Sequence, residues 1–216
     1  MNYAQFQEDV IVDKLLGSPD YGCVVDIGAG DGDEISNSKL FRLRGWDTVL
    51  VESDPRHAAA LDQLERDGAV IHRVAATPSN INDLVPADAT ILSIDIDGDD
   101  IFLLEVLHHQ PRALIIEHNP TIPRHFDVQP ARLGLAVGSS VAALTRVAET
   151  LGYGLVAVTH CNVIFLHGAI SISISAAVPE YAVATEYFTG RPFVVGTPPW
   201  GLDFSNMYPS EDVIVR

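Results

Sequence analysis

A short apolar run passes directly into a glycine-rich turn in the stretch Gly22-Cys23-Val24-Val25-Asp26-Ile27-Gly28-Ala29-Gly30-Asp31-Gly32-Asp33. Residues 24–27 contain a single acid, Asp26, and otherwise lack polar alternation, which is typical of a parallel strand buried on both faces. Glycines at positions 28, 30 and 32 allow a sharp turn and let a ligand lie against bare backbone. A helix should follow, and its first N–H groups would be free to bind an anion.

A second acid, Glu52, ends a second apolar run at residues 48–51. An acid about twenty residues after a glycine turn typically binds the two hydroxyls of a ribose, so the pattern predicts a nucleoside cofactor. The glycine spacing is G-x-G-x-G, and Asp33 stands where a dinucleotide fingerprint has its third glycine. Asp31 and Asp33 would repel a pyrophosphate, whereas S-adenosylmethionine has no phosphate and carries a positive sulfonium. A strand–turn–helix unit without any ligand is the alternative.

Composition narrows the class of protein. The chain has 216 residues, of which 47% are hydrophobic, and this suits one α/β domain with modest additions. The net charge is −16 and the only lysines are Lys14 and Lys39, so we expect neither nucleic acid nor an anionic membrane as partner. No apolar run approaches the length of about 18 residues that spans a bilayer, and no secretory signal is visible. Two isolated cysteines, Cys23 and Cys161, fit a reducing cytoplasm, which is the predicted location.

Apolar strands alternate with helical segments along the chain. We expect strands at residues 24–27, 48–52, 69–74, 90–94 and 113–116, and helices at residues 3–16, 36–44, 55–67, 101–109 and 140–151. Asp54 should cap the third helix, and Ser139 or Ser140 the last. Residues 154–159 and 162–167 are separated by two residues, which is too short for a parallel crossover, so they form an antiparallel hairpin. The pattern predicts an open, doubly wound, mostly parallel α/β sheet with an antiparallel strand near one edge.

The tail has a different character from residues 1–167, which we expect to form the cofactor-binding domain. Residues 170–175 alternate strictly between isoleucine and serine, as a half-buried strand or an exposed edge would. Several prolines then suggest an extended arm. Residues 168–216 could serve as a substrate cap or as a homo-oligomer contact, and both remain open.

Polar side chains follow the fourth and fifth predicted strands. Asp95 and Asp97 come after residues 90–94, and Glu117 and Asn119 come after residues 113–116. Because neighbouring parallel strands end at the same edge of a sheet, these side chains can converge. Their oxygen ligands suit a hard divalent ion such as Mg²⁺, and solvated acids are the alternative.

Other polar residues nearby have simpler explanations or more than one. Asp99 and Asp100 are expected to be the cap and a first-turn acid of the helix that begins at residue 101. His118 could be a general base, a ligand or a structural histidine. His125, in the irregular passage at residues 120–138, is the other candidate base.

Five blocks occur in order with the glycine turn and Glu52. They read Y-A-Q-F-Q-E-D at residues 3–9, S-N-S at 36–38, G-W at 45–46, L-S-I-D-I-D-G-D-D at 92–100 and I-I-E-H-N-P at 115–120. Together they resemble the FkbM-like group of class I S-adenosylmethionine-dependent methyltransferases. Ala4, Gln7 and His118 depart from the group's usual residues. The resemblance covers residues 3–167 and implies a Rossmann-like, seven-stranded fold.

The resemblance also implies an activity and a set of site residues. The activity is methyl transfer to a hydroxyl of a small-molecule acceptor, such as a sugar or a natural product, with S-adenosylmethionine as cofactor. A divalent metal, Mg²⁺ or Mn²⁺, would be held by Asp95, Asp97, Glu117 and Asn119, and the catalytic candidates are Asp95, His118 and His125. The cofactor-binding candidates are Gln5, Asp26, Gly28, Gly30, Gly32, Ser36, Asn37, Glu52, Ser53, Ala75, Ala76 and Asp95. An NAD-dependent oxidoreductase and a non-catalytic binding or assembly protein are the alternatives.

Overall fold

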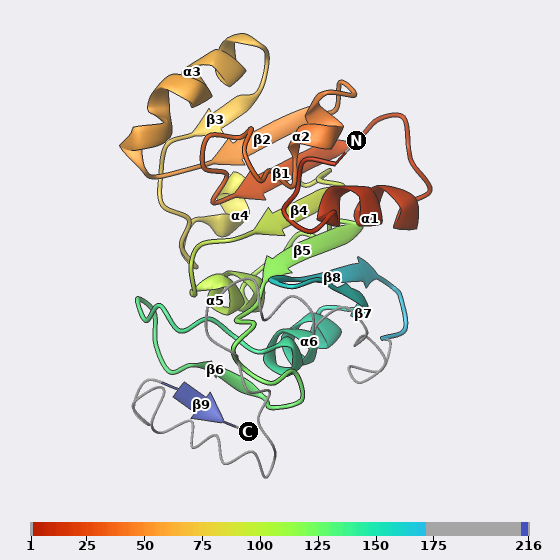
Figure 1. Cartoon of the computed structure of the whole chain (residues 1–216), viewed down its shortest axis with the longest axis vertical. Helices are drawn as coiled ribbons and strands as arrows, with labels where there is room; N and C mark the ends of the chain where they lie inside the picture. Colours follow the sequence, from red (N-terminus) through yellow and green to blue (C-terminus); the bar gives the residue numbers. More distant parts are fainter. Residues whose placement is uncertain (1, 172–212, 216) are drawn as a thin grey trace.

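The computed structural model describes residues 2–171 and 213–215, which contain a seven-stranded sheet flanked by helices (Figure 1). The strand order is β3-β2-β1-β4-β5-β8-β7. Parallel pairing joins the first five strands, and β8 runs antiparallel to both of its neighbours. The strands are β1 (Cys23–Ile27), β2 (Asp47–Val51), β3 (Val70–His72), β4 (Ile91–Ile94), β5 (Ala113–Glu117), β7 (Tyr153–Val158) and β8 (Asn162–His167). The predicted Rossmann-like, mostly parallel sheet with an antiparallel hairpin near one edge is confirmed.

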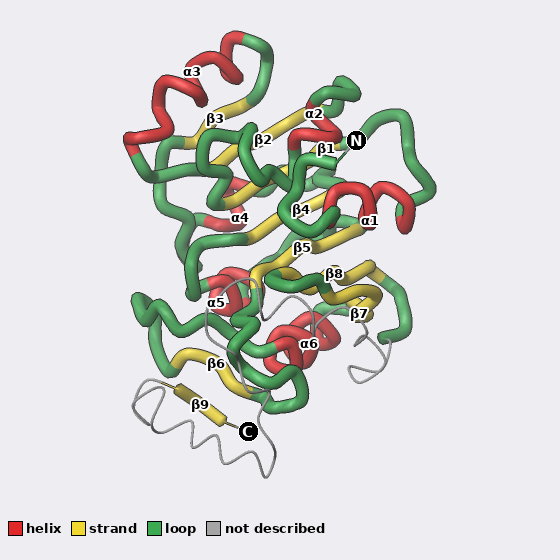
Figure 2. Tube along the Cα trace, in the orientation of Figure 1, coloured by secondary structure: helices red, strands yellow, loops and turns green. Residues whose placement is uncertain are grey.

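Helices cover both faces of the sheet (Figure 2). Val24 packs with Phe41 and Trp46 on the face covered by α1 (Glu8–Leu15) and α2 (Lys39–Arg42). Val25 and its neighbours pack on the opposite face, which is covered by α4 (Ile81–Leu84), α5 (Asp100–Glu105) and α6 (Val141–Thr150). Leu61, in α3 (Ala58–Arg66), packs on β2. All five residues of β1 are buried, which explains why that strand lacks polar alternation.

Two helix starts were predicted correctly, and both depend on local capping bonds. Asp54 caps a short 3₁₀ turn, Pro55–His57, by accepting a hydrogen bond from the N–H of Arg56 at 2.9 Å. Ser140 caps α6 through the N–H of Ala143 at 3.1 Å. These side chains act within three residues of their own position, so the sequence alone identifies them.

The first helix was predicted too early, because α1 begins at Glu8 and not at residue 3. The N–H groups of Tyr3 and Phe6 bond to the side chains of Asp9 and Glu8, and this holds the preceding residues in a turn. Gln7 has a left-handed φ of 67°, which a continuous helix does not allow. The second helix is also shorter than the predicted residues 36–44, because Ser36 and Ser38 take part in a buried polar network instead.

The chain contributes a second, two-stranded sheet beside α6. In it β6 (Val128–Pro130) pairs antiparallel with β9 (Val213–Val215), so the end of the tail lies against residues 128–130 (Figure 1). The alternating stretch predicted at residues 170–175 lies outside the described residues from position 172 onward. The predicted proline-rich arm also lies outside the described residues. Within residues 2–171 and 213–215, no helix has the length and apolar character needed to cross a bilayer.

Candidate cofactor and metal site

The glycine turn after β1 touches the turn after β4. Gly28 has a φ of 82°, and a Cβ atom built on it would lie 1.7 Å from the carbonyl oxygen of Asp95. A Cβ on Gly32 would lie 2.6 Å from Cδ1 of Leu64. A Cβ on Gly30, by contrast, would meet no described atom within 4 Å. Gly28 and Gly32 therefore permit close packing, whereas Gly30 leaves backbone open to a ligand.

Glu52 follows β2 and reaches back to this turn. Its Oε2 accepts a hydrogen bond from the N–H of Gly30 at 2.9 Å, and its Oε1 accepts one from the N–H of Asp54 at 2.6 Å. Each carboxylate oxygen retains a further lone pair for a ligand. Ser53, next in the chain, is exposed. The carboxylate of Glu52 thus lies at the end of β1, where the sequence predicted it.

Asp26 is the buried centre of a polar network, with 4% of its surface exposed. Ser38 donates its hydroxyl to Oδ2 of Asp26 at 2.7 Å, and the hydroxyls of Ser36 and Ser38 are 3.0 Å apart. Asn37 donates to Oγ of Ser93 at 3.0 Å. Burial raises the pKa of Asp26, and the Ser38 hydrogen bond opposes that shift. Ser36 and Asn37 therefore belong to the polar network that supports Asp26. Ser38 and Ser93 belong to the same network, and the sequence did not predict them as site residues.

A cavity of about 330 Å³ lies beyond the ends of β3 and β4. Its apolar walls include Ile96 and Leu103, and Asp99 is its one acid. Ala76 lines the cavity as expected, and Ala75 is exposed. The remaining lining residues are Thr77, Pro78, Leu133 and Gly134. The volume is at the lower end of the range for small-ligand sites.

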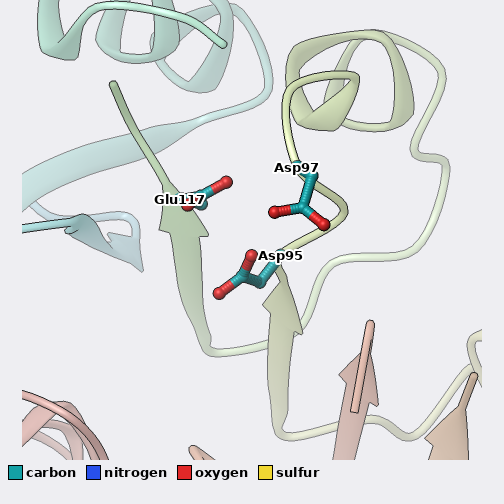
Figure 3. Close-up of side chains that lie close together, drawn as sticks. All are labelled: Asp95, Asp97 and Glu117. Carbon is teal, nitrogen blue, oxygen red and sulfur yellow. The ribbon is translucent and has the colours of Figure 1, made fainter. Parts of the chain in front are cut away.

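Three carboxylates meet at the ends of β4 and β5. Asp95, Asp97 and Glu117 each offer an oxygen atom, and these atoms lie within 4.8 Å of one another. Figure 3 shows the three side chains turned toward a common space, with Asp95 and Glu117 at the strand ends and Asp97 in the turn. A set made only of oxygens fits a hard divalent cation. We call these residues the acid triad.

Without a cation, mutual repulsion and burial disfavour the ionised form of the buried carboxyl groups in the acid triad. Burial, followed by the charges of Asp95 and Asp100, raises the pKa of Glu117 to about 9. Burial, followed by the charges of Asp26 and Asp97, raises the pKa of Asp95 to about 6. Because the two neighbouring carboxyl groups repel each other when both are ionised, Glu117, with the higher pKa, keeps its proton at pH 7 when no cation is bound. A bound cation would replace that proton.

The turn that presents Asp97 is held by Asp100. Asp97 has a left-handed φ of 59°, which is rare for a residue with a side chain. Asp100 accepts hydrogen bonds from the N–H of Ile96 at 2.9 Å and from that of Gly98 at 3.1 Å. Burial raises the pKa of Asp100 to about 7. The prediction that Asp100 is merely a first-turn acid of the helix was therefore incomplete.

Asp99 and Asn119 hold the segment at residues 119–138 against the site. Asp99 is the cap residue of α5, as predicted, but its side chain makes no capping bond. Its two oxygens instead accept from the N–H of Gly134, each at 3.0 Å. Asn119 donates to the carbonyl of Val137 at 2.5 Å and accepts from the N–H and hydroxyl of Thr121 at 2.8 and 2.6 Å. Asn119 as a metal ligand remains a prediction.

The two candidate bases occupy different environments. His118 is 1% exposed, its Nε2 lies 3.4 Å from the carbonyl oxygen of Thr159, and its Nδ1 has no hydrogen-bond partner in the described part of the chain. Burial lowers the pKa of His118 to about 4, so its ring is neutral at pH 7. His125 is exposed and its ring lies 4.4 Å from that of Phe126. Gln5 is also exposed and accepts from the thiol of Cys161 at 3.3 Å.

Known proteins share the fold at low identity. No family model and no curated protein matches the sequence. TehB from Haemophilus influenzae is 12% identical with a TM-score of 0.49, over 74% of this chain and 61% of TehB. Magnesium protoporphyrin IX methyltransferase from Synechocystis PCC 6803, solved with bound SAM, is 12% identical with a TM-score of 0.47, over 74% of this chain and 77% of that one.

The mitomycin 7-O-methyltransferase MmcR is 18% identical with a TM-score of 0.43, over 68% of this chain and 49% of MmcR. The chain thus spans less than two thirds of TehB and about half of MmcR. Because these TM-scores are below 0.5, the assignment of a function depends on the residues of the site.

Proposed function

We propose that the chain is an S-adenosylmethionine-dependent methyltransferase that methylates a hydroxyl of a small molecule, such as a sugar or a natural product, with the help of a divalent cation. The observation that carries the proposal is the 2.9 Å hydrogen bond from Gly30 to Glu52 beside the buried Asp26. The bond holds the Glu52 carboxylate at the glycine turn, and Asp26 lies in the strand that leads into that turn. Such a site repels phosphate and favours a nucleoside whose other end is positively charged.

The residues present fit this cofactor along its length. Asp26 and the turn at residues 28–32 would hold the amino acid part, and Glu52 the ribose hydroxyls. The cavity beside Ala76 and Ile96 has the apolar walls that a planar base requires. Gln5, Ser36, Asn37, Ser53 and Ala75 remain predicted contacts. The bound cofactor supplies a methyl group on a sulfonium, which is already a good leaving group.

The acid triad fits Mg²⁺ or Mn²⁺, and such an ion would lower the pKa of a bound hydroxyl. Glu117 and Asp95 would hold the ion and orient the acceptor oxygen, which is the main task when the leaving group is already activated. His118 is a candidate to take the proton of the acceptor, but burial lowers its pKa to about 4, so it would be a weak base there. His125, which is exposed, is the other candidate for that role, and Asp95 would act on the acceptor through the ion.

Calorimetry with S-adenosylhomocysteine tests the cofactor, because this product binds without reacting. We expect one site per chain with a Kd in the micromolar range (about 1–100 µM), and at least tenfold weaker binding for Glu52→Ala. NAD is the matched ligand for the oxidoreductase alternative, and we expect no heat of binding from it. Tight binding of NAD, or no binding of S-adenosylhomocysteine, would contradict the proposal.

Turnover distinguishes an enzyme from a binding protein. We expect a radiolabelled methyl group to pass from the cofactor to a small molecule in a metabolite extract, and chelation to stop the transfer. Cofactor binding without any labelled product would favour the non-catalytic alternative. Loss of activity in Asp95→Asn together with an unchanged Kd for the cofactor would assign the metal to the chemical step.

We further infer the setting in which the protein acts. The net charge of −16 supports a small-molecule acceptor over nucleic acid or an anionic membrane. A cytoplasmic location and a substrate cap or homo-oligomer contact formed by residues 168–216 are also proposals. Size-exclusion chromatography with light scattering tests whether the protein forms an oligomer. If the tail makes the contact, its deletion should reduce the number of chains per particle.

A further inference from the structure

The first residue of α1 is a fully buried acid. Glu8 has 0% of its surface exposed, and three hydrogen bonds satisfy its carboxylate. Oε1 accepts from the hydroxyl of Thr159 at 2.6 Å and from the amide of Asn162 at 3.1 Å, and Oε2 accepts from the N–H of Phe6 at 2.8 Å. A buried carboxylate with this many donors fixes the geometry of the segments that it joins.

These donors lie beside the acid triad. Asn162 begins β8 and pairs across the sheet with Glu117, the last residue of β5. The neighbouring Cys161 accepts at its carbonyl from the N–H of His118 at 2.7 Å and donates its thiol to Gln5 at 3.3 Å. Glu8 therefore connects the residues that precede α1 to the end of β5.

At its other end the same segment lies near Lys39, which pairs with an acid just after the glycine turn. Nζ of Lys39 lies 5.2 Å from the centre of the Tyr3 ring and 3.2 Å from a carboxylate oxygen of Asp33, directly after Gly32. Tyr3 is therefore linked to the loop after β1 through Lys39, and Gln5 contacts the turn before β8. Figure 1 shows this stretch leading into α1 past β1 and β4.

The backbone of this segment is held in an unfavourable conformation. Gln7 has a φ of 67°, and the carboxylates of Glu8 and Asp9 bond to the N–H groups of Phe6 and Tyr3 on its amino side. A residue with a side chain keeps such a conformation only where its surroundings impose it, and functional sites are where this is most common. The bonds from Glu8 and Asp9 are what impose it here.

We propose that Glu8 is a positioning residue, which holds residues 3–7 across the strand ends as a wall beside the amino acid part of the cofactor. The inference rests on the proposed function, because it needs the cofactor to occupy the glycine turn. Glu8 itself is shielded by Phe6, Thr159 and Asn162 and acts through the segment that it holds. Loss of its charge should therefore weaken cofactor binding without removing any group that touches the cofactor.

Glu8→Gln tests this role. The glutamine side chain has the same volume as glutamate, but its NH2 group would face at least one of the three hydrogen-bond donors and could not accept from it. We expect its Kd for S-adenosylhomocysteine to rise about tenfold, as is typical when a supporting partner of a binding residue is lost. The matched control is Asp13→Asn, which removes another buried acid of α1 that bonds to Arg44 and Ser18. It should lower the Tm as Glu8→Gln does and keep the Kd within about twofold of the wild type.

Hydrogen exchange of the wild-type protein gives a second readout that does not depend on the variant's folding. We expect S-adenosylhomocysteine to slow exchange of the amides at residues 3–9. An unchanged Kd in Glu8→Gln, or exchange at residues 3–9 that does not respond to the ligand, overturns the inference and leaves the proposed function intact. A wild-type protein that does not bind S-adenosylhomocysteine overturns the proposed function itself, and the inference with it.

Discussion

The carbonyl oxygen of Asp95 lies where the side chain of residue 28 would begin, 1.7 Å from the position of a Cβ atom on Gly28. The turns after β1 and β4 can approach this closely only because that atom is missing. The contact joins the glycine turn of the cofactor site to the first residue of the acid triad. A side chain added at position 28 should therefore disturb both the glycine turn and the turn that carries Asp95.

Gly28→Ala should destabilise the protein by roughly 2–5 kcal/mol, since it adds a clash to a left-handed φ. Gly30→Ala is the matched control, because Gly30 also has a positive φ, of 57°, but has open space around it. It should cost about 1–2 kcal/mol. Urea unfolding measures both values, and equal losses would mean that the close contact has no energetic effect.

Without metal, the stability of the protein should fall as the pH rises from about 5 to 9. The folded chain holds a proton on Glu117, whose pKa is raised from 4.5 to about 9, whereas the unfolded chain has already released it. Glu117→Gln should flatten the dependence of Tm on pH in a chelating buffer. Glu34→Gln, at an exposed acid, serves as control, and a slope in Glu117→Gln equal to that of the wild type would contradict the prediction.

Mg²⁺ or Mn²⁺ should raise the Tm by relieving the repulsion within the acid triad. At a concentration about 100-fold above Kd, the stabilisation is about 2.7 kcal/mol, or roughly 5–10 °C for a domain of this size. Asp97→Asn should abolish the shift while keeping the left-handed turn, because asparagine tolerates that conformation. Asp99→Asn changes an acid of the same turn that is not part of the acid triad, so this variant should keep the metal-dependent rise in Tm. An equal rise in Tm in the two variants would argue against a metal site.

The two cysteines should react slowly with thiol reagents in the folded protein. Burial raises the pKa of Cys23 from 9.0 to about 11 and also raises that of Cys161. At pH 8 the thiolate fraction of Cys23 is then about a hundredfold lower than that of an unperturbed thiol. Labelling followed by mass spectrometry in buffer and in urea gives the two rates, and rapid labelling of the folded protein would contradict the prediction.

The sequence predicted the features that depend on pattern or on near neighbours. The buried strands lack polar alternation, and the caps Asp54 and Ser140 act on residues close by, so both could be identified. Of the four residues grouped from the sequence, Asp95, Asp97 and Glu117 do lie together, because neighbouring parallel strands end at one edge of a sheet, whereas Asn119 as a ligand is untested. Metal binding by these three residues is still a prediction.

Features that depend on distant partners could not be predicted. The burial of Glu8 depends on Thr159 and Asn162, which are more than a hundred residues away in the chain. The support of Asp26 by Ser38 requires the helix after β1 to begin late and so is not visible as periodicity. Asp100 was predicted as a first-turn acid, and its bonds to Ile96 and Gly98 in the preceding turn cannot be read from composition.

The segment at residues 119–138 meets the site through contacts that involve its backbone. Asp99 binds the N–H of Gly134, Asn119 binds the carbonyl of Val137, and a Cβ on Gly98 would lie 3.1 Å from the nitrogen of Gly138. Exposed positions between these anchors, such as Arg132 and Leu133, can therefore be exchanged in chimeric proteins more freely than the anchors themselves. Libraries built to alter the choice of acceptor should vary such positions and keep the glycines at 98, 134 and 138 and the buried Ile122 and Val128.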